Sequence, residues 1–455
     1  MLLTVLAVTS VDAGTSTKRR WELCYTQFVD RVFKFPDGFL WGATTSAHQV
    51  EGGNRNDWTE WEQANAERLA REAASKFSHL QNWPEIRVQA EDPANYISGR
   101  ACDHYYRFRE DFDIAKQLGH NAHRFSIEWS RIEPEEGRFD EVEIEHYREV
   151  IAALRERGME PFVTLWHYTL PLWVRDQRRW ENKKTIQDFI RYTRYVVGRL
   201  KDVVRFWIPL NEPSIYAGMA YAIGVFPPQV RSYRRTRKVL GYLSRAHALA
   251  YASIHELQKE AKVGSSYNLH WHEPSRKKSP LDRLAVRVLD AVRDGSQLRG
   301  AERYNDFLGL NYYFRDRIRV VAGGGRFGLV DIRNPNEWVS DRGWDIAPEG
   351  IYRALQKLKR FRLPIYVTEN GIADARDKNR VAFIRKHLTW LAKAMQEGID
   401  VRGYLYWSLL DNFEWDNGFW PRFGLVEVDY KTLQRRIRPS ALEYKKIIEA
   451  NAIDV

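Results

Sequence analysis

Cysteine is scarce in this chain of 455 residues, where only Cys24 and Cys102 occur. Two cysteines cannot build a disulfide framework, and so few thiols are typical of a protein of the reducing cytosol. No run reaches the roughly 18 apolar residues that a membrane span requires. Glycine and proline, at 28 and 17 residues, form no linker-like stretch that would divide the chain. The sequence therefore predicts neither a disulfide-rich scaffold nor a membrane protein, and it favours a cytoplasmic location.

The first residues, MLLTVLAVTSVDAG, form a short apolar core that ends in small residues, as in a signal peptide. The basic residues that should precede such a core follow it instead, at Lys18, Arg19 and Arg20. Secretion therefore stays open beside the cytoplasmic location. We treat residues 1–30 as an extension of uncertain origin and expect residues 31–455 to form one domain, since barrels with long loops can exceed about 400 residues.

Basic residues outnumber acidic ones, and the net charge is +11. Basic runs such as RSYRRTRK at 231–238 could attract polyanions, but a solvated helix face explains them better, and no nucleic-acid-binding motif accompanies them. The HWH triplet at 270–272 places two histidines on one side of a strand, yet no metal-ligand cluster stands out. We therefore predict no nucleic-acid partner, no metal and no cofactor. The oligomeric state is not predictable from the sequence.

Aromatic residues are abundant, with 17 Trp, 23 Tyr and 21 Phe. Leucine, isoleucine and valine usually fill a dry core, whereas Trp and Tyr combine a flat apolar ring with a polar group. Their excess indicates either an aromatic-rich core or a surface that stacks on ring-shaped ligands, and composition leaves both open.

Eight short apolar runs alternate with long amphipathic stretches. The apolar runs span 38–45, 122–129, 160–167, 204–211, 262–270, 306–313, 364–370 and 401–408. The amphipathic stretches, including 104–119, 143–158, 185–200, 243–261 and 378–398, repeat apolar residues every three or four positions, as helices do. This alternation predicts an α/β fold, a single closed (β/α)8 TIM barrel with extended βα loops. An open dinucleotide-binding sheet fits less well, because GATTSAHQVEGG after the first strand is not a phosphate-binding fingerprint.

Polar or indole side chains close or follow every one of these apolar runs. In a parallel barrel the active site lies at the carboxyl ends of the strands, where such residues converge. In chain order they are Gln49, Arg124, His167, Asn211, Glu212, Asn268, Asn311, Tyr313, Glu369, Trp407, Glu414 and Trp415. A purely structural barrel does not need this set, so it indicates a functional site.

Two of these carboxylates, Glu212 and Glu369, follow the fourth and the seventh strand, which can face each other across a barrel. Burying a carboxylate is costly unless another group uses or compensates it. Two carboxylates about 5–5.5 Å apart are what retaining glycoside hydrolysis requires, because one attacks the anomeric carbon while the other protonates the leaving oxygen. An ionised neighbour raises the pKa of the acid and keeps it protonated near neutrality. The alternative is a pair of unrelated glutamates at loop starts.

Six motifs of the chain also occur together, in this order, in a known family: FPDGFLWGATTSAHQVEG, HRFSIEWSRIEP, LNEP, FLGLNYY, VTENG and WSLLDNFEW…RFGLVEVDY. From about residue 33 to the C-terminus the chain resembles the retaining β-glycosidases of glycoside hydrolase family 1. The resemblance implies that Glu212 is the acid/base and Glu369 the nucleophile. It further implies that Arg124 and Tyr313 hold the nucleophile and that Asn211 contacts the 2-hydroxyl of the sugar.

The resemblance also implies a substrate-binding site. Its expected members are Gln49, His167, Trp407, Glu414 and Trp415 around the terminal sugar, Asn268 and Trp344 on the aglycone side, and Tyr168 and Asn311. For Trp344 a plain packing role is the alternative. The intact Glu212 argues against a thioglucosidase, and Glu414 argues against a 6-phospho-β-glycosidase, because a carboxylate would repel the phosphate.

Three features depart from the family pattern. Tyr168 stands where the family usually has tryptophan, which keeps an aromatic wall but loses the indole N–H. The segment 269–310 after the fifth strand is short, which predicts an open rim. The segment 56–87 is more helical than the usual loop there, and its contacts are not predicted.

The predicted function is therefore that of an exo-acting, retaining β-glycosidase, foremost a β-glucosidase, that hydrolyses small-molecule β-glycosides through a covalent glycosyl-enzyme. β-Galactosidase, β-fucosidase, β-mannosidase or transglycosylase activity of the same family stays open, because the sequence does not fix the contacts to the 2- and 4-hydroxyls. A sugar-binding pseudoenzyme is an alternative of another class, which the presence of both glutamates disfavours.

Overall fold

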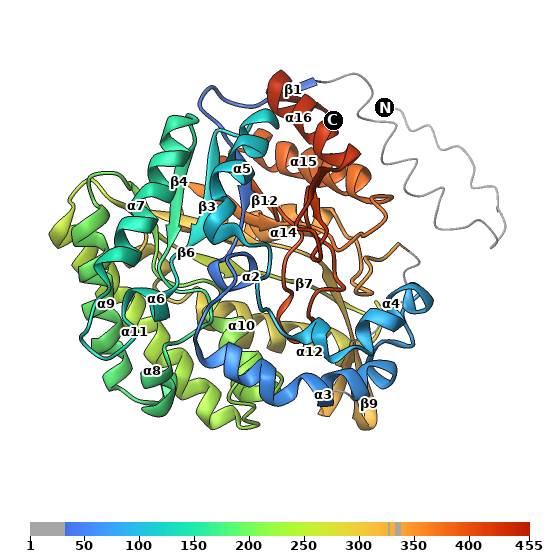
Figure 1. Ribbon diagram of the computed structural model, residues 1–455. Coiled ribbons are helices and arrows are strands. Elements are labelled where there is room, and N and C mark those ends of the chain that lie inside the picture. Colours follow the sequence, from blue (N-terminus) through green and yellow to red (C-terminus); the bar gives the residue numbers. More distant parts are fainter. Residues whose placement is uncertain (1–31, 326–327, 333–337) are drawn as a thin grey trace, which may run out of the picture.

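The computed structural model describes residues 32–325, 328–332 and 338–455, and a closed barrel of eight parallel strands forms its centre (Figure 1). The strands are β2 (Leu40–Thr44), β3 (Ala122–Ser126), β4 (Glu160–Thr164), β5 (Phe206–Ile208), β6 (Lys262–Asn268), β8 (Phe307–Asn311), β11 (Ile365–Asn370) and β12 (Val401–Trp407). Each falls within one of the eight predicted apolar runs, so the predicted barrel is confirmed. The predicted extension, residues 1–30, and Cys24 lie outside the described residues.

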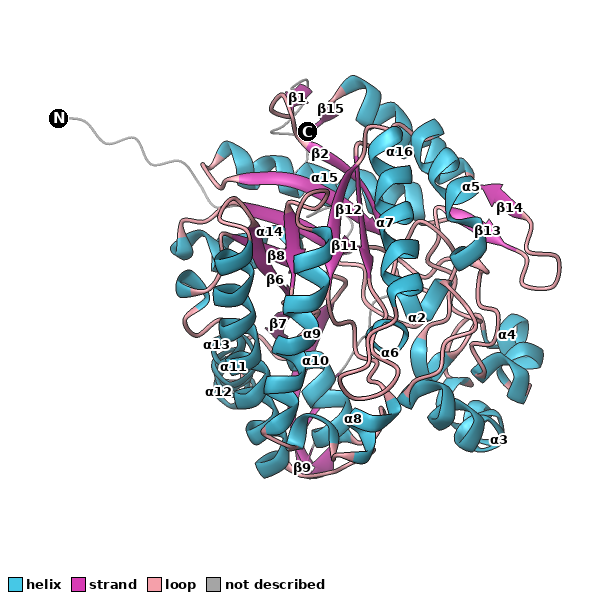
Figure 2. Ribbon diagram, turned by 60° about the vertical axis from the view of Figure 1, so that its left-hand side comes forward, coloured by secondary structure: helices cyan, strands magenta, loops and turns pink. Residues whose placement is uncertain are grey.

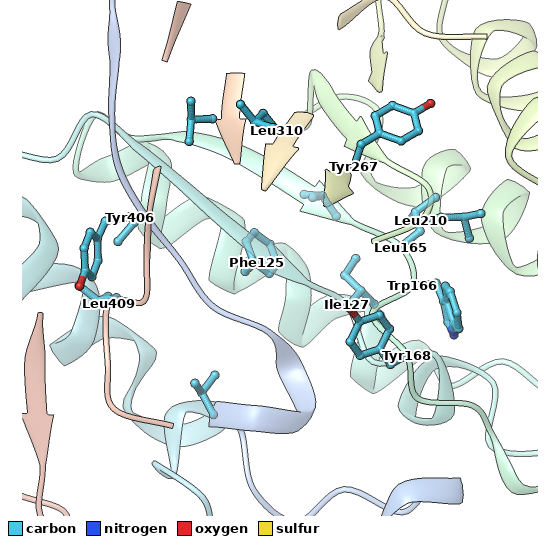
Figure 3. Close-up of a cluster of buried hydrophobic side chains, with 14 of the residues drawn as sticks. Phe125, Ile127, Leu165, Trp166, Tyr168, Leu210, Tyr267, Leu310, Tyr406 and Leu409 are labelled. Atoms are coloured by element: carbon cyan, nitrogen blue, oxygen red, sulfur yellow. The ribbon is translucent and has the colours of Figure 1, made fainter. Parts of the chain in front are cut away.

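Aromatic side chains fill the interior of the barrel at the amino ends of its strands. Phe162 and Phe206 stack there with their ring centroids 4.2 Å apart, and Phe307 and Tyr366 pack edge-on against Phe162, at interplanar angles of 85° and 62°. Because this end is filled, the polar side chains on the inner face gather at the carboxyl ends. The outward-facing residues of the same strands, such as Phe125 in Figure 3, pack under the surrounding helices.

Long amphipathic helices cover the outside of the barrel. The α-helices are α2 (Ala47–Val50), α3 (Asp57–Phe77), α4 (Trp83–Ala90), α5 (His104–Gln117), α6 (Trp129–Ile132), α7 (Glu141–Glu156), α8 (Leu172–Asp176), α9 (Lys184–Leu200), α10 (Pro213–Ala217), α11 (Tyr233–Leu257), α12 (Pro280–Leu289), α13 (Gly295–Gln297), α14 (Glu349–Leu358), α15 (Arg380–Gln396) and α16 (Pro439–Ala450). Short 3₁₀ or π turns are η1 (Pro93–Tyr96), η2 (Arg179–Glu181), η3 (Gly218–Ile223), η4 (Asp290–Asp294), η5 (Ala301–Arg303), η6 (Lys359–Phe361) and η7 (Trp415–Asn417). α5, α7, α9, α11 and α15 confirm the five predicted helices.

α11 corrects the predicted bounds of its helix, 243–261. It begins at Tyr233, because the Ser232 side chain accepts a hydrogen bond from the backbone N–H of Arg235 and caps the first turn. It ends at Leu257. The basic run 231–238 therefore forms the start of this helix, where most of its side chains are exposed, as predicted for a solvated face.

The segment 56–87 is largely helical, as predicted, and consists of α3 and the first half of α4. α3 begins in a capping box, in which the Asn56 side chain accepts from the backbone of Thr59 and the Thr59 hydroxyl accepts from the backbone of Asn56. Trp58 on α3 packs on Trp415, with ring centroids 4.7 Å apart. The helix therefore supports a predicted site residue directly.

Three small sheets lie outside the barrel. β7 (Trp271–Pro274), β9 (Arg315–Gly325) and β10 (Gly328–Ile332) form one of them beyond the carboxyl ends of β6 and β8. β1 (Val32–Lys34) pairs with β15 (Ala452–Asp454), and Figure 2 shows this pair at the end of the molecule opposite β9. β13 (Val426–Val428) and β14 (Arg435–Ile437) pair with each other. Among the described residues, no helix combines the length and the apolar character that crossing a membrane would require.

Candidate active site

Glu369 lies near the end of β11 and is buried, with 4% of its surface exposed. One carboxylate oxygen accepts a short hydrogen bond from Arg124, and the other accepts from the Tyr313 hydroxyl at 2.6 Å. Burial and the negative charge of Glu212 raise the pKa of Glu369 to about 7, while Arg124 and the Tyr313 hydroxyl oppose the rise. The carboxyl group is thus held in a fixed orientation and ionises close to neutrality.

The residues after Glu369 explain why the strand turns here. Asn370 donates to the backbone carbonyl of Tyr312 at 2.6 Å and accepts from the Tyr404 hydroxyl at 2.8 Å, which joins three neighbouring strands. A Cβ atom on Gly371 would lie 1.7 Å from the carbonyl oxygen of Trp407, so only glycine fits. The Asn-Gly pair therefore fixes the position of the preceding carboxylate.

Glu212 follows β5 and precedes α10 in a left-handed backbone conformation, with φ at 42°. One carboxylate oxygen, Oε1, accepts from the amides of Asn268 at 2.7 Å and Asn311 at 2.8 Å. The other, Oε2, accepts from the Tyr168 hydroxyl. We expected Tyr168 to supply only an aromatic wall, and this direct contact with Glu212 was missed.

Arg124, on β3, connects several members of the site. Its guanidinium donates to Asn211 at 2.6 Å as well as to Glu369, and Asn211 in turn lies 3.2 Å from Nε2 of His167. Burial, and next the positive charge of Arg124, lower the pKa of His167 well below its usual value of 6.5, so that the ring is neutral. The Nδ1 atom of His167 is buried and has no hydrogen-bond partner among the residues that the structure describes.

Aromatic rings surround these polar groups. The His167 ring lies between Trp407 and Trp415, with centroid distances of 6.1 and 6.0 Å and nearly parallel planes. Gln49 is fully buried, and its amide N–H groups donate to Asn412 and to the backbone of Phe413. The resemblance implies that Gln49 binds the terminal sugar, but both of its N–H donors already bind groups of the protein.

Glu414 lies beside a residue that the sequence reasoning missed. Arg342 donates to Oε1 of Glu414 at 2.7 Å, and its guanidinium stacks 4.1 Å from the ring centroid of Trp344. Burial raises the pKa of Glu414 to about 7, and the charge of Arg342 opposes this shift. The only signal for Arg342 in the sequence is its position two residues before Trp344.

Trp344 packs at the edge of the site. Its ring contacts those of Phe314 and Tyr313, at centroid distances of 4.6 and 5.8 Å. The structure thus brings all fourteen predicted residues into one connected set. Trp344 joins the set through its ring contact with Tyr313. Gln49 joins it through its hydrogen bond to the backbone of Phe413, the residue before Glu414.

The HWH triplet forms a second polar cluster, on β7 and the residue before it. Ligand atoms of His270, His272 and Asp316 all lie within 4.8 Å of one another, so the triplet has a denser polar surrounding than predicted. Cations accompany the carboxylates here, because Arg293 lies 3.7 Å from Asp316 and Lys357 pairs with Asp290, which accepts from His272. The contacts make this cluster an ion-pair network that joins β7, β9, η4 and α14.

A closed parallel barrel that collects two buried carboxylates, amides and indoles at the carboxyl ends of its strands is a TIM-barrel enzyme with a site suited to a carbohydrate. Comparisons with known proteins agree. The model of the family "Glycosyl hydrolase family 1" matches residues 32–294 and 291–453. The chain belongs to this family, and it is a glycoside hydrolase.

Individual relatives are similar over nearly their whole length. Beta-glucosidase A of Thermotoga maritima is 33% identical over 93% of this chain and 99% of its own. A beta-galactosidase of Sulfolobus acidocaldarius is 31% identical over 93% of this chain and 96% of its own. The solved structure of a beta-glycosidase from Pyrococcus horikoshii matches with a TM-score of 0.81 at 37% identity, and it covers 93% of this chain and 97% of that one.

Proposed function

We propose that this protein is a retaining, exo-acting β-glucosidase in which Glu369 is the nucleophile and Glu212 the acid/base. The observation that carries the proposal is the contrast between the two carboxylates. Glu369 receives hydrogen bonds from a cation and a phenol, which favour an ionised nucleophile. Glu212 receives two amide donors on one oxygen, and its other oxygen contacts a hydroxyl that can also accept a hydrogen bond.

In the first step Glu369 attacks the anomeric carbon, and the bond from that carbon to the aglycone oxygen breaks. Glu212 gives its proton to the departing oxygen. In the second step Glu212 takes a proton from water, the water oxygen bonds to the anomeric carbon, and the ester bond to Glu369 breaks. Two inversions at the same carbon give a product with the original β configuration.

Two buried polar atoms without partners support sugar binding at this place. Nδ1 of His167 and Oδ1 of Asn268 make no hydrogen bond to the described part of the chain, although burial without a partner is costly. Hydroxyl groups of a sugar satisfy both, on the glycone and the aglycone side respectively. Trp407 and Trp415 offer flat faces to the C–H surface of the ring, and Asn211 is assigned the contact with the 2-hydroxyl.

Glucose is the proposed glycone because a relative named as a beta-glucosidase matches over almost the entire chain. The relative named as a beta-galactosidase favours galactosides as a second substrate. Steady-state kcat/KM values for the p-nitrophenyl β-glucoside, β-galactoside, β-fucoside and β-mannoside test this order. A value for the mannoside above that for the glucoside would refute it.

Replacement of the two glutamates tests the mechanism. We expect Glu369→Ala to lose turnover of p-nitrophenyl β-glucoside and to regain it with azide, which fills the space of the carboxylate and gives the α-glucosyl azide. Glu212→Ala is the matched control, since azide there attacks the glycosyl-enzyme and gives the β-glucosyl azide. If Glu369→Ala retains wild-type turnover, or if azide gives the β product with it, the assignment of the nucleophile is wrong.

The proposal includes a single catalytic domain over residues 31–455 and a cytoplasmic location, which the small number of thiols supports. Limited proteolysis that releases two stable fragments would contradict the single domain. Recovery of the activity in the secreted fraction of expressing cells would contradict the location.

A further inference from the structure

Tyr168 is held rigidly in the loop after β4. Its side chain is 3% exposed, and its backbone φ of 77° is a strained value for a bulky residue. Its ring lies 5.1 Å from that of Trp415 and 5.9 Å from that of Phe226, and Figure 3 draws it among the buried side chains that include Trp166. Such a placement fixes where the hydroxyl points, and it points at Oε2 of Glu212.

The two oxygens of Glu212 differ in their surroundings. Oε1 accepts from the amides of Asn268 and Asn311, and the orientation of Asn311 is set by Thr368, whose hydroxyl donates to its oxygen at 2.6 Å. An oxygen that already faces two N–H donors has no place for a proton of its own. Oε2 is therefore the oxygen of Glu212 that has room to carry a proton. In the described part of the chain, Tyr168 is the group that hydrogen-bonds to this oxygen.

We propose that Tyr168 is a positioning residue for the catalytic proton of Glu212, a role that rests on the proposed function. The phenol donates to Oε2 when Glu212 is ionised, and its oxygen accepts when Oε2 carries the proton. As the proton leaves for the aglycone oxygen in the first step, the phenol O–H turns toward the new carboxylate and stabilises it. The reverse turn accompanies the second step, when Oε2 takes a proton from water, so Tyr168 itself gains and loses nothing.

The phenol keeps its own proton throughout this cycle. Burial and the charge of Glu212 raise the pKa of Tyr168 well above 10. The other titratable or charged groups around Glu212 are Glu369 on β11 with its partner Arg124 on β3, Tyr313 after β8, and Glu414 before η7. These groups stay in place when the Tyr168 hydroxyl is removed, so a change in pH dependence reports on that hydroxyl.

The pH dependence of kcat/KM for p-nitrophenyl β-glucoside tests the inference. In the proposed mechanism the basic limb of this profile reports the loss of the proton that the acid/base must donate. Without the Tyr168 hydroxyl the ionised form loses a donor, so we expect Tyr168→Phe to move the basic limb upward by about 1 pH unit. Tyr216→Phe is the matched control, because this neighbouring buried ring stacks on Tyr168 and its hydroxyl makes no bond to Glu212. We expect the basic limb of Tyr216→Phe to coincide with that of the wild type.

Two further measurements separate this role from a structural one. With 2,4-dinitrophenyl β-glucoside, whose leaving group needs little protonation, we expect the difference between Tyr168→Phe and wild type to vanish. Tyr168→Leu, which removes the ring together with its hydroxyl and brings no new donor, should show the same upward shift of the limb. Superimposed basic limbs for wild type and Tyr168→Phe, or equal losses on both substrates, overturn the inference. These outcomes leave the proposed function intact, whereas an inert wild type that 2-deoxy-2-fluoro-β-glucosyl fluoride does not label overturns the proposed function itself.

Discussion

Removal of the Arg124 charge gives a quantitative test of how the buried carboxylate of Glu369 is held. Arg124 is 1% exposed, and its side chain donates to Glu369, to Asn211 and to the Thr164 hydroxyl. Arg124→Met keeps most of the volume and deletes the charge. Loss of one partner of a buried ion pair costs about 3–5 kcal/mol, because the remaining charge is buried without compensation.

Glu369 escapes this cost by taking up a proton, which makes the loss depend on pH. In the wild type its pKa is about 7, and without Arg124 this pKa rises further, while the unfolded chain keeps the ordinary value of 4.5. Above pH 7 the native variant therefore holds a proton that native wild type and both unfolded chains lack. The stability of the variant relative to wild type falls as pH rises, by about 1.4 kcal/mol per pH unit, until the full cost is reached.

Denaturation by guanidinium chloride between about pH 7 and about pH 9, followed by tryptophan fluorescence, measures this slope. We expect the difference in unfolding free energy to grow with pH for Arg124→Met. In the double variant Arg124→Met/Glu369→Gln we expect no such growth, since the titrating group is gone. A pH-independent difference for the single variant would show that Arg124 does not hold the ionised form of Glu369.

Two more predictions concern neighbours of the site. Arg342→Met removes the donor to Glu414 and raises the pKa of that carboxyl above about 7. We therefore expect a higher KM for glucosides at neutral pH, which recovers in part as the pH rises. A KM equal to that of wild type at every pH would contradict this. Gly371→Ala places a Cβ 1.7 Å from the Trp407 carbonyl, and we expect it to lower the unfolding free energy by about 1–3 kcal/mol. Gly198→Ala is the control, because Gly198 lies on an exposed helix face with open space around an added Cβ; we expect it to raise the unfolding free energy by up to about 1 kcal/mol. Equal melting temperatures for both variants would refute the argument.

The sequence by itself was sufficient for the barrel. Runs such as 364–370 and 401–408 are apolar without interruption, and a strand buried on both faces requires this pattern. Local signals were weaker at helix ends, which explains why the start of α11 was placed ten residues too late. Its first ten residues, 233–242, include four basic side chains and a single buried one, Val239, so they have little apolar periodicity.

For the site, the sequence determined which residues end the strands, and parallel strands of a barrel end at one mouth. Glu212, Glu369 and Arg124 could be named on this basis, together with the order of the family motifs. Their arrangement is consistent with the roles that we propose for them.

Only the tertiary structure decided which atoms meet. The contact between the Tyr168 hydroxyl and Glu212 joins the segments that follow β4 and β5, and that between Arg342 and Glu414 joins loops 72 positions apart. Nothing in a linear pattern marks such pairs, because direction and distance depend on strand register and on the packing beneath the loops. The amide of Gln49 was likewise assigned to sugar binding from its residue type, while its donors are taken by Asn412 and Phe413. The periodicity of the chain could thus predict which residues lie at the ends of the strands. Their hydrogen-bond partners across the barrel follow only from the folded geometry.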